Sequence, residues 1–304
     1  MKKLQTLIAA VDFTSSCRNA LREAVRIASV SGGKVVAIHV MDEGLVNELK
    51  KALSSSQATV RAEWENRLRK FVEESDVTTV SGASAFIDAE IRIGHPFAEL
   101  AEACRVHRAD LLVMGVKGAD SDSHRVGAIA AKCVRKASSD VLLISDDARG
   151  PFKHLVTFVD FSDNSAKAVR FALELARQDG ASVDCVHVYQ SALALSLDYG
   201  GLAAPMPVGA DAETLEHWSH ELEAFVKPLV GSDYATVPVT LRVMERVNIR
   251  EAIIDHVNER KADLVVLGTR GKTGLRELLI GTTAEKVVAN APCSILAVKP
   301  DEVD

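Results

Sequence analysis

The sequence predicts an α/β protein of two repeated doubly wound domains, each a five-stranded parallel sheet with helices on both faces. The length of 304 residues suits about two domains of ~150 residues. Val11-Asp12-Phe13 recurs as Val159-Asp160-Phe161, and His39-Val40 recurs as His187-Val188, both 148 residues further on. Within each repeat, short apolar runs alternate with helix-length segments, which is the pattern of a parallel sheet covered by crossover helices.

The first domain is assigned to residues 1–149. Its short apolar, β-branched runs predict buried strands, and the longer segments between them predict helices. The strands are expected at 4–11, 34–40, 85–93, 110–115 and 141–145, and the helices at 15–30, 45–74, 96–107 and 127–138.

The second domain, residues 150–304, follows a join at Gly150-Pro151 and repeats this order. Beyond the second strand the offset between repeats grows from 148 to 153, which places an insertion at 191–210, a glycine, proline and alanine-rich loop. The strands are expected at 154–159, 182–188, 236–244, 263–268 and 294–298, and the helices at 164–178, 212–230, 249–259 and 282–290.

A glycine-punctuated loop follows the fourth strand of the second domain. Gly268 and Gly271 are separated by two residues, and nine more precede Gly281-Thr282, which opens the last predicted helix. The first turn of a helix has unpaired N–H groups and a positive dipole, and glycines let a phosphate approach the backbone closely. A Walker loop is excluded because Val266 occupies the position of its first glycine, and the dinucleotide fingerprint is also absent.

This spacing resembles the ATP-binding motif of the universal stress protein family. With the repeat, the resemblance covers essentially the whole chain, as two family domains fused in tandem. It implies that ATP, with or without Mg²⁺, binds in the second domain across the carboxyl ends of the strands. By position it assigns the backbone of Phe158 to the ribose, Asp160 to the adenosine end, the Val188 backbone to adenine, Gly268 to ribose and phosphate, and Gly271, Gly281 and Thr282 to the phosphates.

Cations surround the same loop. Arg270, Lys272 and Arg276 occur with no carboxylate between Gly268 and Leu275. A basic rim of this kind favours an anion, so Arg270 and Lys272 join the predicted nucleotide site.

The first domain departs from the motif. Gly115 and Gly118 are retained, but only eight residues separate Gly118 from Gly127, and Ala128 replaces the threonine. The loop between them carries two aspartates, whose charge would repel a triphosphate. This domain is therefore predicted to hold ATP poorly.

The expected function is ATP binding in stress response or signalling, without catalysis. Phosphoryl transfer needs carboxylates for Mg²⁺ and water, and Glu277 is the only carboxylate in 269–280. Two alternatives stay open. One is a slow ATPase or phosphotransfer enzyme, and the other is a nucleotide-independent scaffold whose apolar insertion covers a hydrophobic ligand.

Composition bounds the partners and the compartment. The net charge of −6 predicts neither nucleic-acid nor anionic-membrane binding, and no run approaches the ~18 apolar residues of a membrane span. Five cysteines without a Cys-x-x-Cys pair predict reduced thiols in a cytoplasmic protein. The apolar last strands, 141–144 and 295–298, are expected to pair within the chain as a pseudo-dimer, and a further homodimer through the outer helices stays open.

Overall fold

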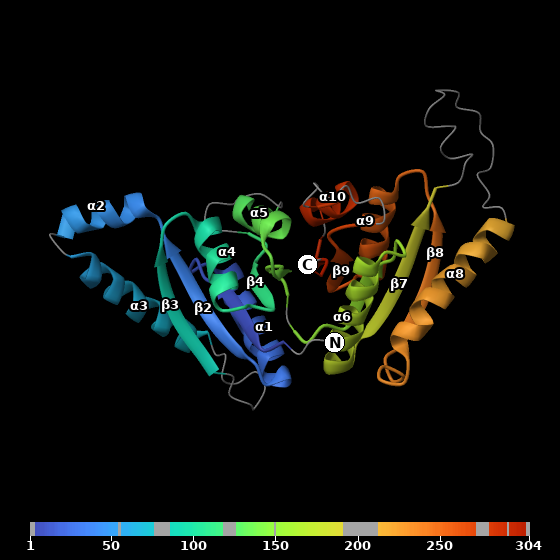
Figure 1. Cartoon of the computed structure of the whole chain (residues 1–304), viewed down its shortest axis with the longest axis horizontal. Coiled ribbons are helices and arrows are strands. Elements are labelled where there is room, and N and C mark those ends of the chain that lie inside the picture. Colours follow the sequence, from blue (N-terminus) through green and yellow to red (C-terminus); the bar gives the residue numbers. More distant parts are fainter. Residues whose placement is uncertain are drawn as a thin grey trace, which may run out of the picture. The chain divides into compact units, whose positions relative to one another are not determined.

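The computed structural model describes residues 4–53, 56–75, 86–117, 126–148, 150–190, 212–271, 280–290 and 292–301. The chain separates into two compact units, Met1–Gly150 and Pro151–Asp304 (Figure 1). The pairing of the last strands of the two units stays a prediction.

The first unit contains a parallel sheet with the strand order β3-β2-β1-β4-β5. The chain begins at the centre of this sheet and turns outward twice, which is the doubly wound arrangement. Its elements are β1 (Thr6–Ala10), α1 (Ser15–Ser31), β2 (Lys34–Met41), α2 (Glu43–Leu53), α3 (Gln57–Glu74), β3 (Phe86–Ile93), α4 (Pro96–Val106), β4 (Leu111–Gly115), α5 (Ala128–Lys136) and β5 (Asp140–Ile144).

The second unit repeats this topology in the order β10-β9-β6-β7-β8, again with parallel pairs. Its elements are β6 (His154–Phe158), α6 (Asp163–Asp179), β7 (Ser182–Tyr189), α8 (Ala212–Val230), β8 (Val239–Glu245), α9 (Ile249–Arg260), β9 (Leu264–Gly268), α10 (Thr282–Asn290) and β10 (Ser294–Val298). The predicted insertion at 191–210 lies outside the described residues.

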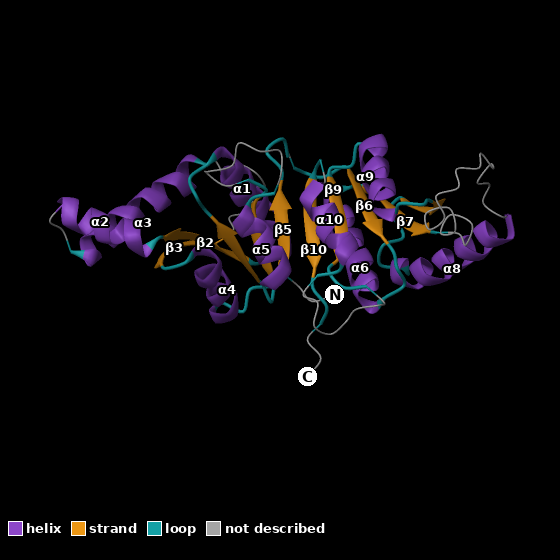
Figure 2. Cartoon of the chain, turned by 90° about the horizontal axis from the view of Figure 1, so that it is seen from above, coloured by secondary structure: helices purple, strands orange, loops and turns teal. Residues whose placement is uncertain are grey.

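Helices cover both faces of each sheet. In the second unit α6 and α8 contact one face and each other, while α9 packs on the other face beside α10 (Figure 2). In the first unit α1 and α3 lie on one face, and α4 and α5 on the other. The predicted fold class, with two doubly wound domains of five parallel strands each, is confirmed.

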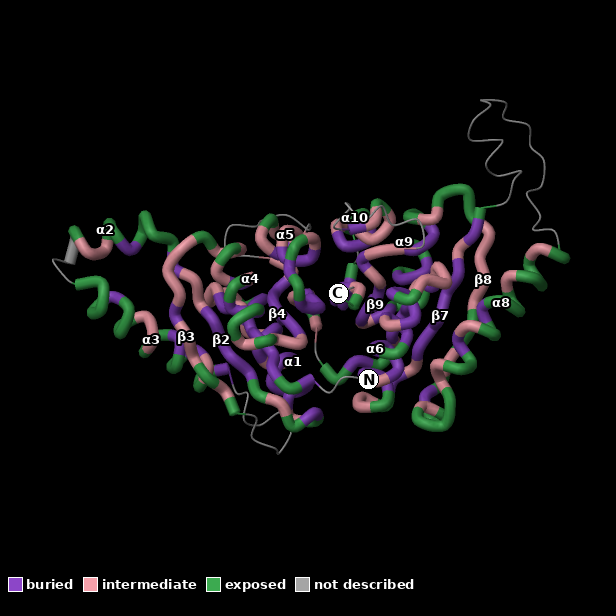
Figure 3. The backbone as a smooth tube through the Cα atoms, viewed as in Figure 1, coloured by how far each residue is buried: buried purple, intermediate pink, exposed green. Residues whose placement is uncertain are grey.

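The core follows from the apolar strands. Every residue of β4, β5 and β10 is buried, as expected for strands covered on both faces (Figure 3). None of the described helices has the length and hydropathy that a membrane crossing requires.

One predicted element was wrong. The single helix expected at 45–74 is two helices, α2 and α3. Ser56 caps the second of them, because its hydroxyl accepts the backbone N–H of Thr59. A serine side chain competes well for such a bond at a helix start, so the serine run at 54–56 was the missed boundary signal.

The repeated Val-Asp-Phe and His-Val motifs build an aromatic cluster. In the second unit Phe161 adopts φ +62°, and its ring lies 4.6 Å from that of His187 and 5.8 Å from that of Trp218. His187 Nδ1 donates to the carbonyl of Val159 at 2.8 Å, which ties the ends of β6 and β7 together. The cluster recurs in the first unit, so it belongs to the framework of the fold; its members there are Phe13, His39, Trp64 and Phe71.

A buried aspartate in the second unit connects β7 to β8 and to α9. Asp184 of β7 is 1% exposed, and its Oδ2 accepts from Arg260 Nε of α9 at 2.9 Å. Arg242 Nε and His256 Nε2 each lie 3.4 Å from the same oxygen. Burial lowers the pKa of His256, and the Asp184 carboxylate opposes that shift. This cluster joins α9, which walls the candidate site, to β7 and β8.

Candidate functional site

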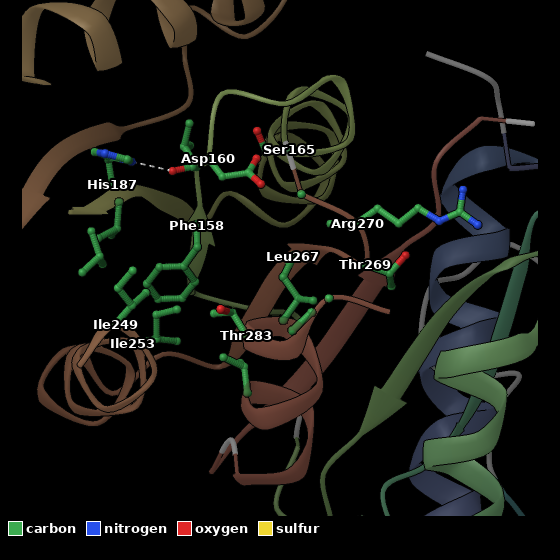
Figure 4. A pocket seen from close by; sticks show the side chains of 18 of the residues that line it. Phe158, Asp160, Ser165, His187, Ile249, Ile253, Leu267, Thr269, Arg270 and Thr283 are labelled. Carbon is green, nitrogen blue, oxygen red and sulfur yellow. Dashed lines mark hydrogen bonds between the residues drawn. The ribbon is translucent and has the colours of Figure 1, made fainter. Parts of the chain in front are cut away.

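A cavity of about 320 Å³ lies in the second unit, where β6, β7 and β9 end. Its size falls at the lower end of small-molecule sites, and the carboxyl ends of parallel strands are where open α/β sheets bind ligands. Eight of the nine predicted site residues line it, drawn from segments far apart in the sequence (Figure 4): Phe158, Asp160, Val188, Gly268, Arg270, Gly271, Gly281 and Thr282. The ninth, Lys272, lies outside the described residues.

The end of β6 contributes an aromatic ring and a carboxylate. Phe158 was predicted to act through its backbone, but its ring also projects into the cavity, toward Ile249 and Ile253 (Figure 4). Asp160 Oδ1 accepts the backbone N–H of Ser162 at 3.0 Å and also its hydroxyl, so the carboxylate is held in a turn. The residue that caps α6 is therefore Ser162, whose hydroxyl accepts the N–H of Ser165.

The end of β7 supplies backbone. Val188 is half-buried at the cavity wall, directly after His187. Because a carbonyl can only accept, the bond from His187 to Val159 places a proton on Nδ1 of this ring. The tie holds the strand ends that carry Asp160 and Val188.

The mouth of the glycine loop is closed by backbone hydrogen bonds. Thr269 N donates to the carbonyl of Val298 at 2.9 Å, and Gly281 N donates to the carbonyl of Thr269 at 2.8 Å. The loop therefore leaves β9 and returns to α10 at nearly one point, and the first turn of α10 faces the cavity through Thr282 and Thr283. As predicted, α10 begins at Thr282.

Each of the three motif glycines is required for a different physical reason. A Cβ on Gly268 would lie 2.9 Å from Asn164 Nδ2, so this glycine is required by the packing of α6 on the strand end. A Cβ on Gly271 would lie 2.5 Å from Asp160 Oδ2, which brings the loop directly beside that carboxylate. Of the residues that the structure describes, a Cβ on Gly281 would meet just the Thr269 carbonyl, at an ordinary 3.7 Å, and Gly281 lines the cavity.

The predicted basic rim is only partly realised among the described residues. Arg270 lines the cavity, but its guanidinium points away from Phe158 and Asp160 (Figure 4). Lys272 and Arg276 lie outside the described residues. Within the described ranges no three His, Cys, Asp or Glu side chains gather as a metal would need.

Sequence reasoning missed the wall opposite the strands. Ile249 and Ile253, one turn apart on α9, line the cavity, and Val287 of α10 does the same. Apolar residues four apart on a helix are ordinary core signals, and only the fold reveals that this pair borders a hollow. Together with Phe158 they make one side of the cavity apolar, while the loop side is polar backbone.

The first unit differs at the corresponding positions. Gly115 is explained by packing, since a Cβ there would lie 2.3 Å from Ser16 Oγ. Lys117, the counterpart of Arg270, forms an ion pair with Asp146 at 2.9 Å, and this bond raises the pKa of the lysine. The loop whose aspartates were expected to repel phosphate, 118–125, lies outside the described residues.

The sequence profile of the Universal stress protein family matches residues 3–145 and again residues 151–299. The chain belongs to this family. The two matches cover both units, so it is a tandem universal stress protein, as the repeat predicted. Membership carries the general stress-protein assignment and the fold, while the ligand is a separate matter.

Curated relatives match about half of this chain. A universal stress protein of Methanocaldococcus jannaschii is 32% identical over 148 residues, which is 49% of this chain and 82% of that protein. One from Thermus aquaticus is also 32% identical over 148 residues, covering 99% of its own length.

Some solved structures match nearly the whole length of the chain. The crystal structure of a universal stress protein from Archaeoglobus fulgidus has a TM-score of 0.62 at 14% identity, covering 98% of this chain and 99% of that one. A functionally unknown protein from Pseudomonas aeruginosa has a TM-score of 0.66 at 17% identity, covering 98% and 93%. At these identities the likeness concerns the fold of the tandem protein.

Proposed function

We propose that the second domain of this universal stress protein binds one adenine nucleotide, ATP by preference, and that the first domain does not. The observation that carries the proposal is the cavity at the ends of β6, β7 and β9, where eight of the predicted residues meet. The protein would then respond to the nucleotide state of the cell by binding, as a stress or signalling component.

The chemistry of the walls suits the two ends of such a ligand. Phe158, Ile249 and Ile253 offer an apolar surface for a base, and the Val188 backbone offers the polar partners a strand end provides. At the other end, the first turn of α10 opens on the cavity at Gly281 and Thr282. Its unpaired N–H groups and the threonine hydroxyl would hold phosphate oxygens, and a Mg²⁺ ion would accompany them as part of the ligand.

Calorimetric titration tests the proposal directly. The purified chain is freed of bound small molecules by partial unfolding and refolding, and ATP is then titrated with and without Mg²⁺. We expect close to one ATP per chain, because the intact spacing and Thr282 occur only in the second domain. Two equivalent sites per chain would contradict the predicted difference between the domains. A titration that shows neither heat nor saturation would contradict ATP binding.

We further propose a binding role without efficient catalysis. Among the described residues that line the cavity, Asp160 is the only carboxylate, and one of its oxygens is held by Ser162. Hydrolysis at an ordinary rate requires groups that place Mg²⁺ and a water. We expect phosphate release from ATP far below the ~10 s⁻¹ of a median enzyme, and sustained turnover near that rate would favour the alternative of an ATPase.

A further inference from the structure

Asn164, in the first turn of α6, reaches across to the glycine loop. The residue is 6% exposed, and its Nδ2 donates to the carbonyl of Arg270 and to the carbonyl of Val298, both at 3.2 Å. A carboxamide carries two N–H donors on one nitrogen, so both bonds can be made at once. Because both neighbours are carbonyls, only the NH₂ side of the amide fits this position.

This contact adds something to the frame that closes the loop. Backbone bonds already fix Thr269 to Val298 and Gly281 to Thr269. Asn164 fixes the next carbonyl, that of Arg270, which belongs to the peptide bond joining Arg270 to Gly271. In a trans peptide the N–H points opposite to the C=O, so holding this carbonyl aims the Gly271 N–H away from Asn164. Both residues of that peptide line the cavity.

The first domain keeps the frame and changes this residue. Val116 N donates to the carbonyl of Ile144 at 2.9 Å, and Gly127 N donates to the carbonyl of Val116 at 2.8 Å, as at the mouth of the second loop. The place of Asn164 is taken by Ser16, which meets Gly115 as Asn164 meets Gly268. A serine has one hydroxyl hydrogen and cannot donate to two carbonyls together.

We propose that Asn164 is a positioning residue for the phosphate end of the nucleotide site: by holding the Arg270 carbonyl it orients the Gly271 N–H as a phosphate donor. The inference rests on the proposed function and deepens it. The start of α6, which lies 106 residues from Arg270 in the sequence, would then control the affinity for phosphate. The base end is formed by other residues, Phe158, Val188 and the α9 isoleucines.

The test compares Asn164→Ser with the unchanged protein, using ATP and adenosine as the two probes. Adenosine has the base and ribose but no phosphate. We expect the variant to bind ATP about tenfold more weakly, ~1.4 kcal/mol or roughly one hydrogen bond, and adenosine within about twofold. Ser16→Asn, the mirror substitution in the first domain, is the matched control and should leave both affinities unchanged.

The outcomes separate this inference from the proposed function. Equal losses for ATP and adenosine, or no loss for either, would overturn the role of Asn164 while nucleotide binding stands. If the unchanged protein binds neither probe, the proposed function fails, and the inference fails with it. Asn164→Thr, which fills more of the space, repeats the test; if neither variant folds, the residue is purely structural and the inference is wrong.

Discussion

Replacing Gly281 by valine is expected to abolish ATP binding while the second domain stays folded. Among the described residues the new Cβ would meet the Thr269 carbonyl alone, 3.7 Å away, and the packing there accommodates it. The two methyl groups beyond it would stand in the cavity at the first turn of α10, where phosphate is proposed to lie. We expect a loss of affinity of at least about 100-fold, ~2.7 kcal/mol, measured by calorimetry on a protein whose circular dichroism spectrum is unchanged.

Gly127→Val is the matched control, because Gly127 precedes α5 in the first domain as Gly281 precedes α10 in the second. It should leave ATP affinity as it is. If Gly281→Val binds ATP as tightly as the unchanged protein, the phosphates do not lie at the first turn of α10. Gly268 and Gly271 are poorer probes, since a Cβ at either position would strike Asn164 or Asp160 first; for Gly271, the expected loss of binding then follows from displacing Asp160 as well as from blocking phosphate.

Replacing Asp184 by alanine is expected to lower the free energy of unfolding of the second domain by about 3 kcal/mol. The change removes a charge-assisted bond to Arg260 and leaves the buried His256 without its acidic neighbour. The guanidinium side chains of Arg242 and Arg260 are 41% and 38% exposed, so they can recover water, which keeps the expected loss at the low end for a buried ion pair.

Each domain carries its own fluorescent reporter for this measurement, Trp64 in the first and Trp218 in the second. A Trp64→Phe background therefore follows urea unfolding of the second domain alone. Asp255→Ala, which removes an exposed carboxylate one residue before His256 on the same helix, should change stability by less than about 0.5 kcal/mol. An equally small effect of Asp184→Ala would show that the buried cluster adds no net stability.

The sequence predicted the structure well at positions where the local backbone conformation favours one particular type of residue. The repeated Val-Asp-Phe and His-Val pairs located two strand ends, and the glycine spacing located the start of α10 at Thr282. It was less informative where a role depends on a distant neighbour. Gly268 was assigned to the ligand and does line the cavity, but the structure adds a packing reason that the sequence did not reveal, the approach of Asn164 from α6.

Other parts of the site had no local signal at all. Ile249 and Ile253 look like any buried pair on an amphipathic helix, and only the fold places them at a hollow. Phe158 was assigned by its backbone, because position in the motif says nothing about where a side chain projects. The helix break before α3 was missed, because an apolar pattern can continue across two helices while a serine cap interrupts the backbone.

The hydrogen bond that closes each glycine loop allows the loop to vary while the strand and helix at its ends stay in place. The two ends meet through Gly281 N and the Thr269 carbonyl in one domain, and through Gly127 N and the Val116 carbonyl in the other, at 2.8 Å in both. Eight residues separate the last two motif glycines in the first domain and nine in the second, yet the framework at the mouth is the same. Because one added residue changes the entropy of closing such a loop very little, the length of the loop can change at little cost to folding. The duplicated domains therefore carry two glycine loops that are closed by the same hydrogen bonds. The sequence of each loop can change to suit a different function.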